Sequence, residues 1–116
     1  MAEHEGEEKM REAIQGTLFQ MGRFRAGYHD PHWNLLEGHG IRAYEHTIHF
    51  NKSYRNTPSV EVALNYIDIQ QDGANPRLGV EAIKVSEDRF QLRIFTWWDT
   101  HVHEVGVTWM AIGEPA

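Results

Sequence analysis

The chain contains no cysteine. Without thiols, a disulfide framework, a thiolate nucleophile and a zinc–thiolate site are excluded. Basic residues are also few, 11 against 17 acidic ones, and the formal net charge is -6. Because no basic stripe is present to neutralise phosphates, we expect no nucleic-acid partner. No apolar run approaches membrane-spanning length, so we expect no membrane insertion.

Motifs for covalent and phosphate chemistry are missing as well. The three serines, Ser53, Ser59 and Ser86, stand in polar turns and form no nucleophile elbow. The glycines are dispersed and build no phosphate loop. We therefore predict no catalytic residues, no enzyme activity and no cofactor. The first ten residues are acidic and polar, unlike a signal peptide, which leaves a cytoplasmic setting or a place in a virion or fibre assembly.

Residues 90–113 carry the strongest pattern in the chain. Apolar and polar residues alternate with period two on both sides of residues 97–103, as in half-buried strands. We expect these two strands to form an antiparallel hairpin. Earlier segments alternate in the same way at 20–27, with Met21 and Phe24 as inward candidates, and at 42–50, 60–66 and 78–85.

Six short strands with turn signals between them and no crossover helices favour an all-β fold, a six-stranded antiparallel β-sandwich. We predict this domain over residues 20–116. Its expected core is Val60, Val62, Leu64, Leu78, Val80, Phe90, Leu92, Ile94, Val105, Val107 and Trp109. Residues 3–19 have a narrow apolar stripe at helical spacing and predict an N-terminal α-helix, so that 1–19 is a separate segment. The helix packs either on its own domain or on copies of itself.

The turn at 97–103 has an unusual composition. Two indoles, a carboxylate and two imidazoles stand where a structural hairpin would carry Asn-Gly or a similar pair. His101 and His103 would share one face of an extended segment, and with Asp99 they suggest a metal-dependent enzyme. Nothing supplies a further ligand, and the prediction for this turn is no bound metal.

Sugar binding is the other use of such a turn. A pyranose needs a flat aromatic face for its C–H side and planar donors and acceptors for its hydroxyls. Trp97 and Trp98 supply the first, and adjacent strand positions face opposite ways, so at least one indole stays exposed. Arg77, Asp99 and His103 supply the second, together with the polar loop at 29–39.

Residues 50–113 resemble the H-type lectin domain, the family of the snail agglutinins and the C-terminal domain of discoidin. The resemblance rests on Phe50, Pro58-Ser59-Val60, Leu64, Arg77-Leu78, Val85, Phe90, Thr96-Trp97-x-Asp99-Thr100-x-Val102 and Val105-x-Val107-x-Trp109-x-Ala111-Ile112. It implies a six-stranded β-sandwich that assembles as a homotrimer. It also implies binding of N-acetylgalactosamine and related galactose-type sugars at the cleft between protomers.

Carried over residue by residue, the resemblance implies that Arg77 hydrogen-bonds the sugar and that Trp97 belongs to the site. Trp98 stands where the snail lectins have His, and His103 where they have Tyr. Their acceptor Asp aligns nearest to His39, in Glu37-Gly38-His39-Gly40, a departure that bears on which sugar is preferred. The predicted carbohydrate-binding residues are Arg77, Trp97, Trp98, His103, His39 and Gly38.

The sequence therefore favours a trimeric carbohydrate-binding module whose partners are glycans, and a fibre or receptor-binding tip is one setting for it. The competing interpretation is a non-catalytic trimerisation or assembly domain that has lost the sugar site. A bundle of three N-terminal helices would suit either.

Overall fold

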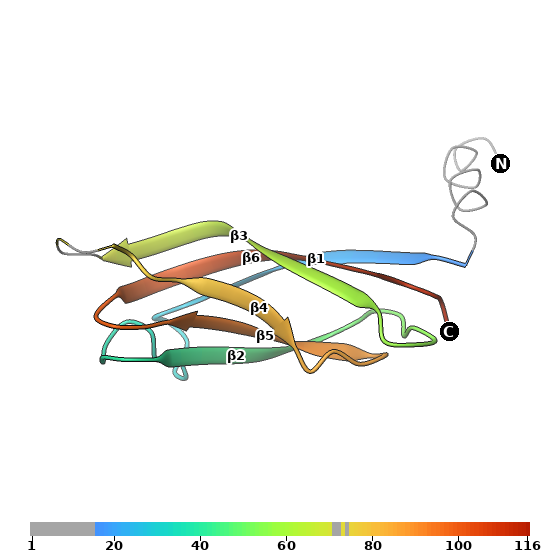
Figure 1. Cartoon of the computed structure of the whole chain (residues 1–116), viewed down its shortest axis with the longest axis horizontal. Helices are drawn as coiled ribbons and strands as arrows, with labels where there is room; N and C mark the ends of the chain where they lie inside the picture. Colours follow the sequence, from blue (N-terminus) through green and yellow to red (C-terminus); the bar gives the residue numbers. More distant parts are fainter. Residues whose placement is uncertain (1–15, 71–72, 74) are drawn as a thin grey trace.

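A computed structural model of the chain describes residues 16–70, 73 and 75–116. Six strands lie in this part: β1 (Leu18–Gly27), β2 (Arg42–His49), β3 (Ser59–Gln70), β4 (Gly79–Ile83), β5 (Arg89–Thr96) and β6 (His101–Gly113). They form two antiparallel three-stranded sheets, ordered β1-β6-β3 and β2-β5-β4, stacked as two layers (Figure 1). The predicted all-β sandwich of six strands is confirmed.

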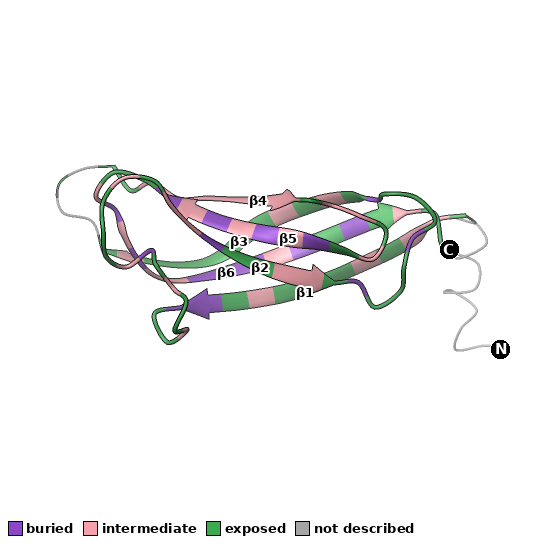
Figure 2. Ribbon diagram, turned by 90° about the horizontal axis from the view of Figure 1, so that it is seen from below, coloured by how far each residue is buried: buried purple, intermediate pink, exposed green. Residues whose placement is uncertain are grey.

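The core lies between the central strands of the two sheets, and buried residues recur along β5 and β6 (Figure 2). Phe90, Leu92 and Ile94 point inward from β5, while Val105, Val107 and Trp109 do so from β6. These six predicted core residues are confirmed. The predicted residues Val60, Val62, Leu78 and Val80 are partly buried against this core.

The predicted hairpin of the last two strands is wrong. β5 pairs with β2 and β4, whereas β6 pairs with β1 and β3, so the two strands lie in different sheets. Both are central strands with both edges occupied, and their inward side chains meet across the core. Alternation reports which face of a strand is buried but not which strand pairs beside it. The short segment at 97–100 therefore crosses from one layer to the other.

The first strand also departs from expectation. β1 begins at Leu18, and Phe19 pairs with Ile112, so the predicted helix cannot extend to residue 19 and the domain begins before residue 20. Gly16 and Thr17 are not helical either, and residues 3–15 of the predicted helix lie outside the described residues. Met21, predicted inward, is exposed, because the inward position is Gly22. A Cβ on Gly22 would lie 2.8 Å from the Trp109 indole, so glycine makes room for that ring.

Leu64 is the one predicted core residue that is exposed. It lies on β3, an edge strand, and the pairing with β6 shifts between Leu64 and Tyr66. A bulge of this kind bends the strand locally, here at an edge where little covers the side chain.

The two ends of the sandwich differ. The segments at 28–41 and 97–100 lie at one end, and the start of β1 and the end of β6 lie at the other (Figure 1). In the described ranges, no helix is long and apolar enough to cross a membrane.

Candidate functional site

The segment at 28–40 is folded over one end of the sandwich and held there by a few contacts. Leu35 is fully buried, and its carbonyl accepts a hydrogen bond from the Val102 amide at 2.8 Å. The Trp33 indole donates to the Val102 carbonyl, also at 2.8 Å. A loop fixed in this way presents its remaining polar groups in a defined arrangement.

Asp30 holds the beginning of this loop. Its carboxylate accepts hydrogen bonds from the Tyr44 hydroxyl and, at 2.8 Å, from the His32 amide. The bond from Tyr44, followed by the one from His32, holds the pKa of Asp30 below its usual value. Burial, together with the bond to Asp30, raises the pKa of Tyr44 to about 12.

Arg42, which opens β2, joins this loop to the crossing at 97–100. Its guanidinium donates to five backbone carbonyls, those of Leu35 (3.5 Å), Glu37 (2.9 Å), Gly40 (3.1 Å), Trp98 (2.9 Å) and Thr100 (3.1 Å). Desolvation lowers the pKa of Arg42 from its usual high value. One side chain therefore satisfies carbonyls on both segments, and it holds the backbone of Glu37 close to that of Trp98.

Trp98 has a left-handed backbone, with φ of 63°. Bulky residues rarely adopt this region, where strain costs about 1–3 kcal/mol and often marks a functional position. Its carbonyl accepts from the Gly40 amide at 2.9 Å as well as from Arg42. The indole is 56% exposed, and the His39 ring lies 5.7 Å from it. The surrounding structure thus holds a large aromatic face out to solvent.

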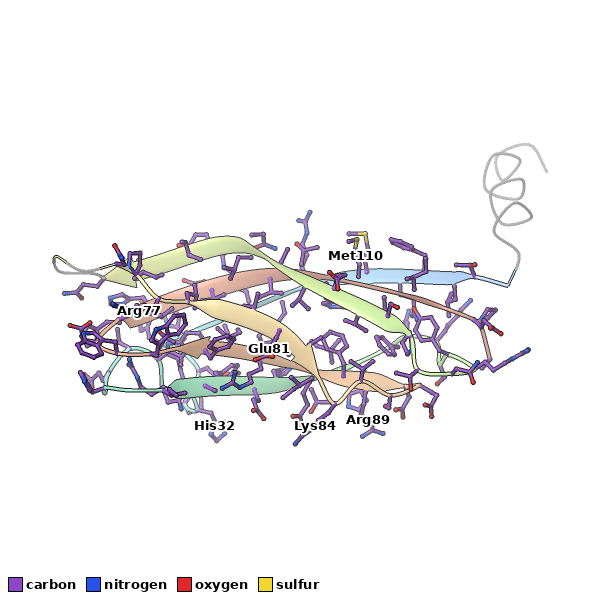
Figure 3. All side chains as sticks on the ribbon, viewed as in Figure 1. His32, Arg77, Glu81, Lys84, Arg89 and Met110 are labelled. Atoms are coloured by element: carbon purple, nitrogen blue, oxygen red, sulfur yellow. The ribbon has the colours of Figure 1, made fainter. Side chains whose placement is uncertain are left out.

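Arg77 lies beside this indole, at the same end of the molecule (Figure 3). Its guanidinium carbon is 5.8 Å from the Trp98 ring centre. Its backbone amide donates to the Thr100 hydroxyl at 3.1 Å, and its carbonyl accepts from the Thr96 hydroxyl. The Arg77 backbone is therefore anchored to the crossing at 97–100. Its half-buried side chain extends toward Trp98 and Asp99.

Asp99 adds an acceptor to the same place. The Nη1 atom of Arg77 lies 4.0 Å from Asp99 Oδ1, too far for a hydrogen bond. Among the described residues, that buried oxygen has no hydrogen-bond partner. The Asp99 side chain is 48% exposed, so its other carboxylate oxygen can accept from a ligand. With the Arg77 guanidinium and the Trp98 ring nearby, it suits a ligand that carries hydroxyl groups on an apolar ring.

His103 lies in a neighbouring hollow and not beside Arg77. This hollow of about 370 Å³ is lined by Leu36, Glu37, Gln70, His101 and His103. His101 Nδ1 lies 2.6 Å from the Leu36 carbonyl, which fixes the ring and leaves the other ring nitrogen available. The Glu37 side chain is exposed and forms no ion pair or hydrogen bond within the part of the chain that the structure describes.

Trp97 points to a different surface from Trp98. It lies on the outer face of the β2-β5-β4 sheet, with its ring 5.9 Å from that of Phe95 in a stacked arrangement. Ile41, Arg93, Phe95 and Trp97 line a shallow hollow of about 360 Å³ there. Trp97 is 39% exposed, so neither indole of the pair is a core residue.

Gly38 has a structural part in this arrangement. Its φ of 100° lies in the region that favours glycine, and a Cβ there would approach Arg42 Cδ to 3.0 Å. The structure therefore places Arg77, Trp98 and His39 around the crossing, with Gly38 against the Arg42 side chain. His103 lies in the adjacent hollow, and Trp97 faces the other sheet surface.

Sequence reasoning did not identify Arg42, Glu37 and Gln70 as site residues. Nothing in the sequence distinguishes Arg42 from any other strand residue, because its partners are carbonyls from two distant segments. Glu37 had a weak signal, since it is the one carboxylate between Asp30 and Glu45 in the polar loop. Gln70 ends a long strand, and only the fold places it near His101.

A metal centre finds no support in these side chains. Across residues 16–70, 73 and 75–116, no group of three or more His, Asp or Glu residues is arranged to hold a metal ion. His101 and His103 line one hollow, but Asp99 is not among the residues that line it. The Asp99 carboxylate lies near the Arg77 guanidinium instead.

Residues 45–112, more than half of the chain, match the family model of the H-type lectin domain. The chain belongs to the H-type lectin domain family. The match runs from β2 nearly to the end of β6 and so contains Arg77, Trp97, Trp98 and His103. The predicted resemblance is confirmed, and membership supports a carbohydrate-binding module.

Two further likenesses extend this result. A Fuscovulum blasticum protein named "ATP synthase subunits region ORF 7" is 33% identical over 79 residues, which are 68% of each chain. Recombinant discoidin II of Dictyostelium discoideum superposes with a TM-score of 0.76 at 19% identity, over 88% of this chain and 39% of discoidin II. A second discoidin II structure gives the same score over 86% and 38%. These structures share the fold, and this chain spans about two fifths of discoidin II.

Proposed function

We propose that this H-type lectin domain is a homotrimeric lectin that binds galactose, N-acetylgalactosamine or a related glycan at the end of the sandwich, between protomers. The observation that carries the proposal is the grouping of Trp98, Arg77 and Asp99. An exposed indole on a strained backbone stands beside a guanidinium and a carboxylate whose side chain is 48% exposed. A sugar hydroxyl at this place would accept from Arg77 and donate to the accessible oxygen of Asp99, while the apolar side of the ring stacks on Trp98.

The neighbouring hollow supplies the second set of polar contacts. The Glu37 carboxylate has two acceptor oxygens and suits two adjacent hydroxyls. His101 and His103 line the same hollow. In the trimer we expect the Glu37 and His103 side of one protomer to face the Arg77 and Trp98 side of the next. Glu37 then performs the acceptor role that the sequence suggested for His39, while His39 packs near Trp98.

The position of the site supports presentation at a tip. Leu18, where β1 begins, pairs with Gly113, where β6 ends, at the end of the sandwich opposite to the site (Figure 1). A fibre attached through that end would display the glycan site outward.

A glycan-array screen of the purified protein, paired with Arg77→Ala, tests the proposal. A guanidinium hydrogen bond contributes about 1.5–3 kcal/mol, so we expect Arg77→Ala to weaken binding at least tenfold. Arg89→Ala is the matched control, because this exposed arginine lies toward the other end of the chain's fold (Figure 3). Binding that survives in Arg77→Ala would contradict the site.

The second candidate is an assembly domain without a sugar site. The exposed apolar face formed by Phe19, Met21, Met110 and Ile112 favours it, since such a face serves assembly whether or not sugar binds. This alternative predicts that the protein forms a stable trimer and binds no glycan on the array. Both results together would establish it.

A further inference from the structure

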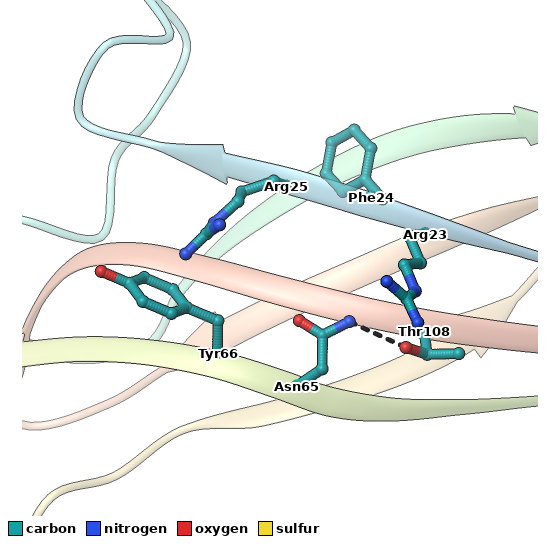
Figure 4. A pocket seen from close by; sticks show the side chains of 6 residues that line it. All are labelled: Arg23, Phe24, Arg25, Asn65, Tyr66 and Thr108. Carbon is teal, nitrogen blue, oxygen red and sulfur yellow. Dashed lines mark hydrogen bonds between the residues drawn. The ribbon is translucent and has the colours of Figure 1, made fainter.

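A shallow polar hollow of about 430 Å³ lies on the outer face of the β1-β6-β3 sheet, lined by Arg23, Phe24, Arg25, Asn65, Tyr66 and Thr108. Arg23 and Arg25 extend over it from β1, and Asn65 and Tyr66 border it from β3 (Figure 4). None of these residues belongs to the group of Trp98, Arg77 and Asp99. The hollow is therefore a second polar feature of the surface.

The hollow is formed because the central strand has short side chains at this place. Gly106 of β6 pairs with Arg25 on one side and with Tyr66 on the other, and the next outward residue of β6, Thr108, pairs with Arg23. Long side chains on the two edge strands therefore stand around a floor of glycine backbone and one threonine.

An irregularity in β3 adds a fixed polar group to this floor. The pairing with β6 shifts between Leu64 and Tyr66, so Asn65 has no paired residue on β6. Its amide donates to the Thr108 hydroxyl at 2.8 Å (Figure 4). A Cβ on Gly106 would overlap with the Asn65 side chain, so glycine leaves room for it. Bulges are common next to functional sites, where they re-aim a side chain.

The Arg25 guanidinium is held in one place within the hollow. Its Nε atom lies 2.9 Å from the Glu104 carboxylate, and its guanidinium carbon lies 3.6 Å from the centre of the Tyr66 ring. The ion pair with Glu104 uses one edge of the guanidinium and leaves further N–H donors for a ligand. Groups positioned in this way lose little freedom when a ligand binds.

Two more donors complete the arrangement. Arg23 has no ion-pair or hydrogen-bond partner in the part of the chain that the structure describes. The Thr108 hydroxyl accepts from Asn65, so its own proton is available to a ligand. Two guanidinium groups and a hydroxyl therefore surround the same hollow.

The charge of the hollow is opposite to that of the chain. Acidic residues outnumber basic ones, 17 to 11, yet no carboxylate lines the hollow. Among the described residues, Glu104 is the one carboxylate that forms an ion pair with a lining side chain, so the charge of Arg23 is left uncompensated. Because a net charge of -6 repels anions in general, only a local arrangement of donors can retain one here.

We propose that this hollow binds one oxyanion group, a carboxylate, sulfate or phosphate, between the guanidinium groups of Arg23 and Arg25, with the Thr108 hydroxyl as a third donor. The planar fork of a guanidinium matches the oxygens of these groups and forms parallel hydrogen bonds with them. The oxyanion is carried by an acidic sugar or is a free inorganic ion. All the lining residues come from one chain, so the inference rests neither on the sugar site nor on the homotrimer.

Isothermal titration calorimetry of the full chain tests the site. Sodium sulfate, sodium phosphate and sodium glucuronate are titrated separately at a constant ionic strength set with sodium chloride, so that general screening is the same in every run. We expect saturable binding of one anion per chain. Arg23→Gln removes the uncompensated charge at an exposed position and should weaken this binding at least tenfold.

Arg55→Gln is the matched control, because it removes an exposed arginine outside the hollow, and it should bind like the parent. Circular dichroism verifies that both variants are folded. The absence of saturable binding for all three anions overturns the site, and so does binding that is equally strong in Arg23→Gln. Tighter binding of glucuronate than of the inorganic ions supports the site and assigns the oxyanion to an acidic sugar. The reverse order also supports the site and assigns it to a free ion.

The same variants separate this inference from the proposed lectin function. Arg77→Ala should lose glycan binding on the array and keep the calorimetric signal of the anion. Arg23→Gln should lose the anion and keep the binding of neutral glycans. An anion signal that disappears in Arg77→Ala and persists in Arg23→Gln would place the anion at the sugar site and overturn the hollow as its location.

Discussion

At the scale of single residues, Trp98 and Arg42 carry the candidate site in different ways. Trp98 has a left-handed backbone conformation, and its ring is exposed to solvent. The Arg42 side chain, in contrast, donates its hydrogen bonds to backbone carbonyls of the same chain. One residue supplies the surface that a ligand would meet, and the other keeps that surface in place.

Trp98→Gly should separate stability from binding. Glycine adopts the observed φ without strain, so we expect the free energy of unfolding to stay constant or to rise by up to about 1 kcal/mol. Trp98→Ala keeps the strain and should be less stable than Trp98→Gly by about 1 kcal/mol. Both variants should lose glycan binding. Chemical denaturation and the array measure the two effects, and a glycine variant that still binds would remove Trp98 from the site.

At the scale of elements, two segments far apart in the chain form one surface. The loop at 28–40 and the crossing at 97–100 share the backbone hydrogen bond from the Gly40 amide to the Trp98 carbonyl at 2.9 Å, and Arg42 donates to carbonyls of both segments. One guanidinium with fixed geometry therefore makes most of the hydrogen bonds that join them.

Arg42→Lys tests this clamp. An ammonium group has three donors on a flexible stem and cannot satisfy the five carbonyls that Arg42 contacts. We expect a loss of about 1–3 kcal/mol in the free energy of unfolding, together with weaker glycan binding. Arg55→Lys, at an exposed position, serves as the control and should change neither quantity. Unchanged stability in Arg42→Lys would show that the loop is held by its other contacts, those of Leu35, Trp33, Asp30 and Gly40.

The connection between β4 and β5 should make the fold acid-sensitive. Hydrogen bonds from Arg89 and then Ser86 lower the pKa of Asp88 from 3.8 to about 2. A depressed pKa means that the contribution is present above the unfolded value and is lost as pH falls from about 4 to about 2. Asp88→Asn should therefore lower the melting temperature near neutral pH, and the difference from the parent should shrink below about pH 4. A difference that does not vary with pH would contradict this assignment.

At the scale of the whole molecule, the site and the apolar face lie on different parts of the sandwich. The end that carries Trp98 and Arg77 is opposite to the paired strand ends at Leu18 and Gly113, and the outer face of β1-β6-β3 runs between them (Figures 1 and 3). Assembly through that face would place three sites at one end of the trimer.

Met110→Glu should dissociate the proposed trimer while the fold persists, because this side chain is exposed in the single chain and belongs to the apolar face formed by Phe19, Met21, Met110 and Ile112. Three linked sites can exceed one site in apparent affinity by about 10²–10⁴. We expect binding to a dense glycan surface to fall by a factor in that range, measured by surface plasmon resonance beside sedimentation. A dissociated variant with undiminished surface binding would show that avidity is not used.

Several features of the fold could be predicted from the sequence because they are local. Alternation at 90–96 and 105–111 identified the inward residues of β5 and β6, and the turn residues divided the chain into six strands. Met21 and Leu64 were assigned wrongly to the buried face, because their exposure depends on parts of the fold that are distant in the sequence. Gly22 is inward because the distant Trp109 needs its space, and Leu64 is uncovered because β3 is an edge.

The sequence by itself determined the class of the fold, the family, and the residue types that could meet a sugar, because period-two patterning and the Thr96–Val102 motif are written in neighbouring residues. Only the tertiary structure decided that Trp97 and Trp98 are both exposed, that Glu37 and His103 line one hollow, and that Arg42 joins two segments. These are relations between residues up to 66 positions apart, Glu37 to His103. They arise when two sheets close on one core, and no local pattern specifies that step.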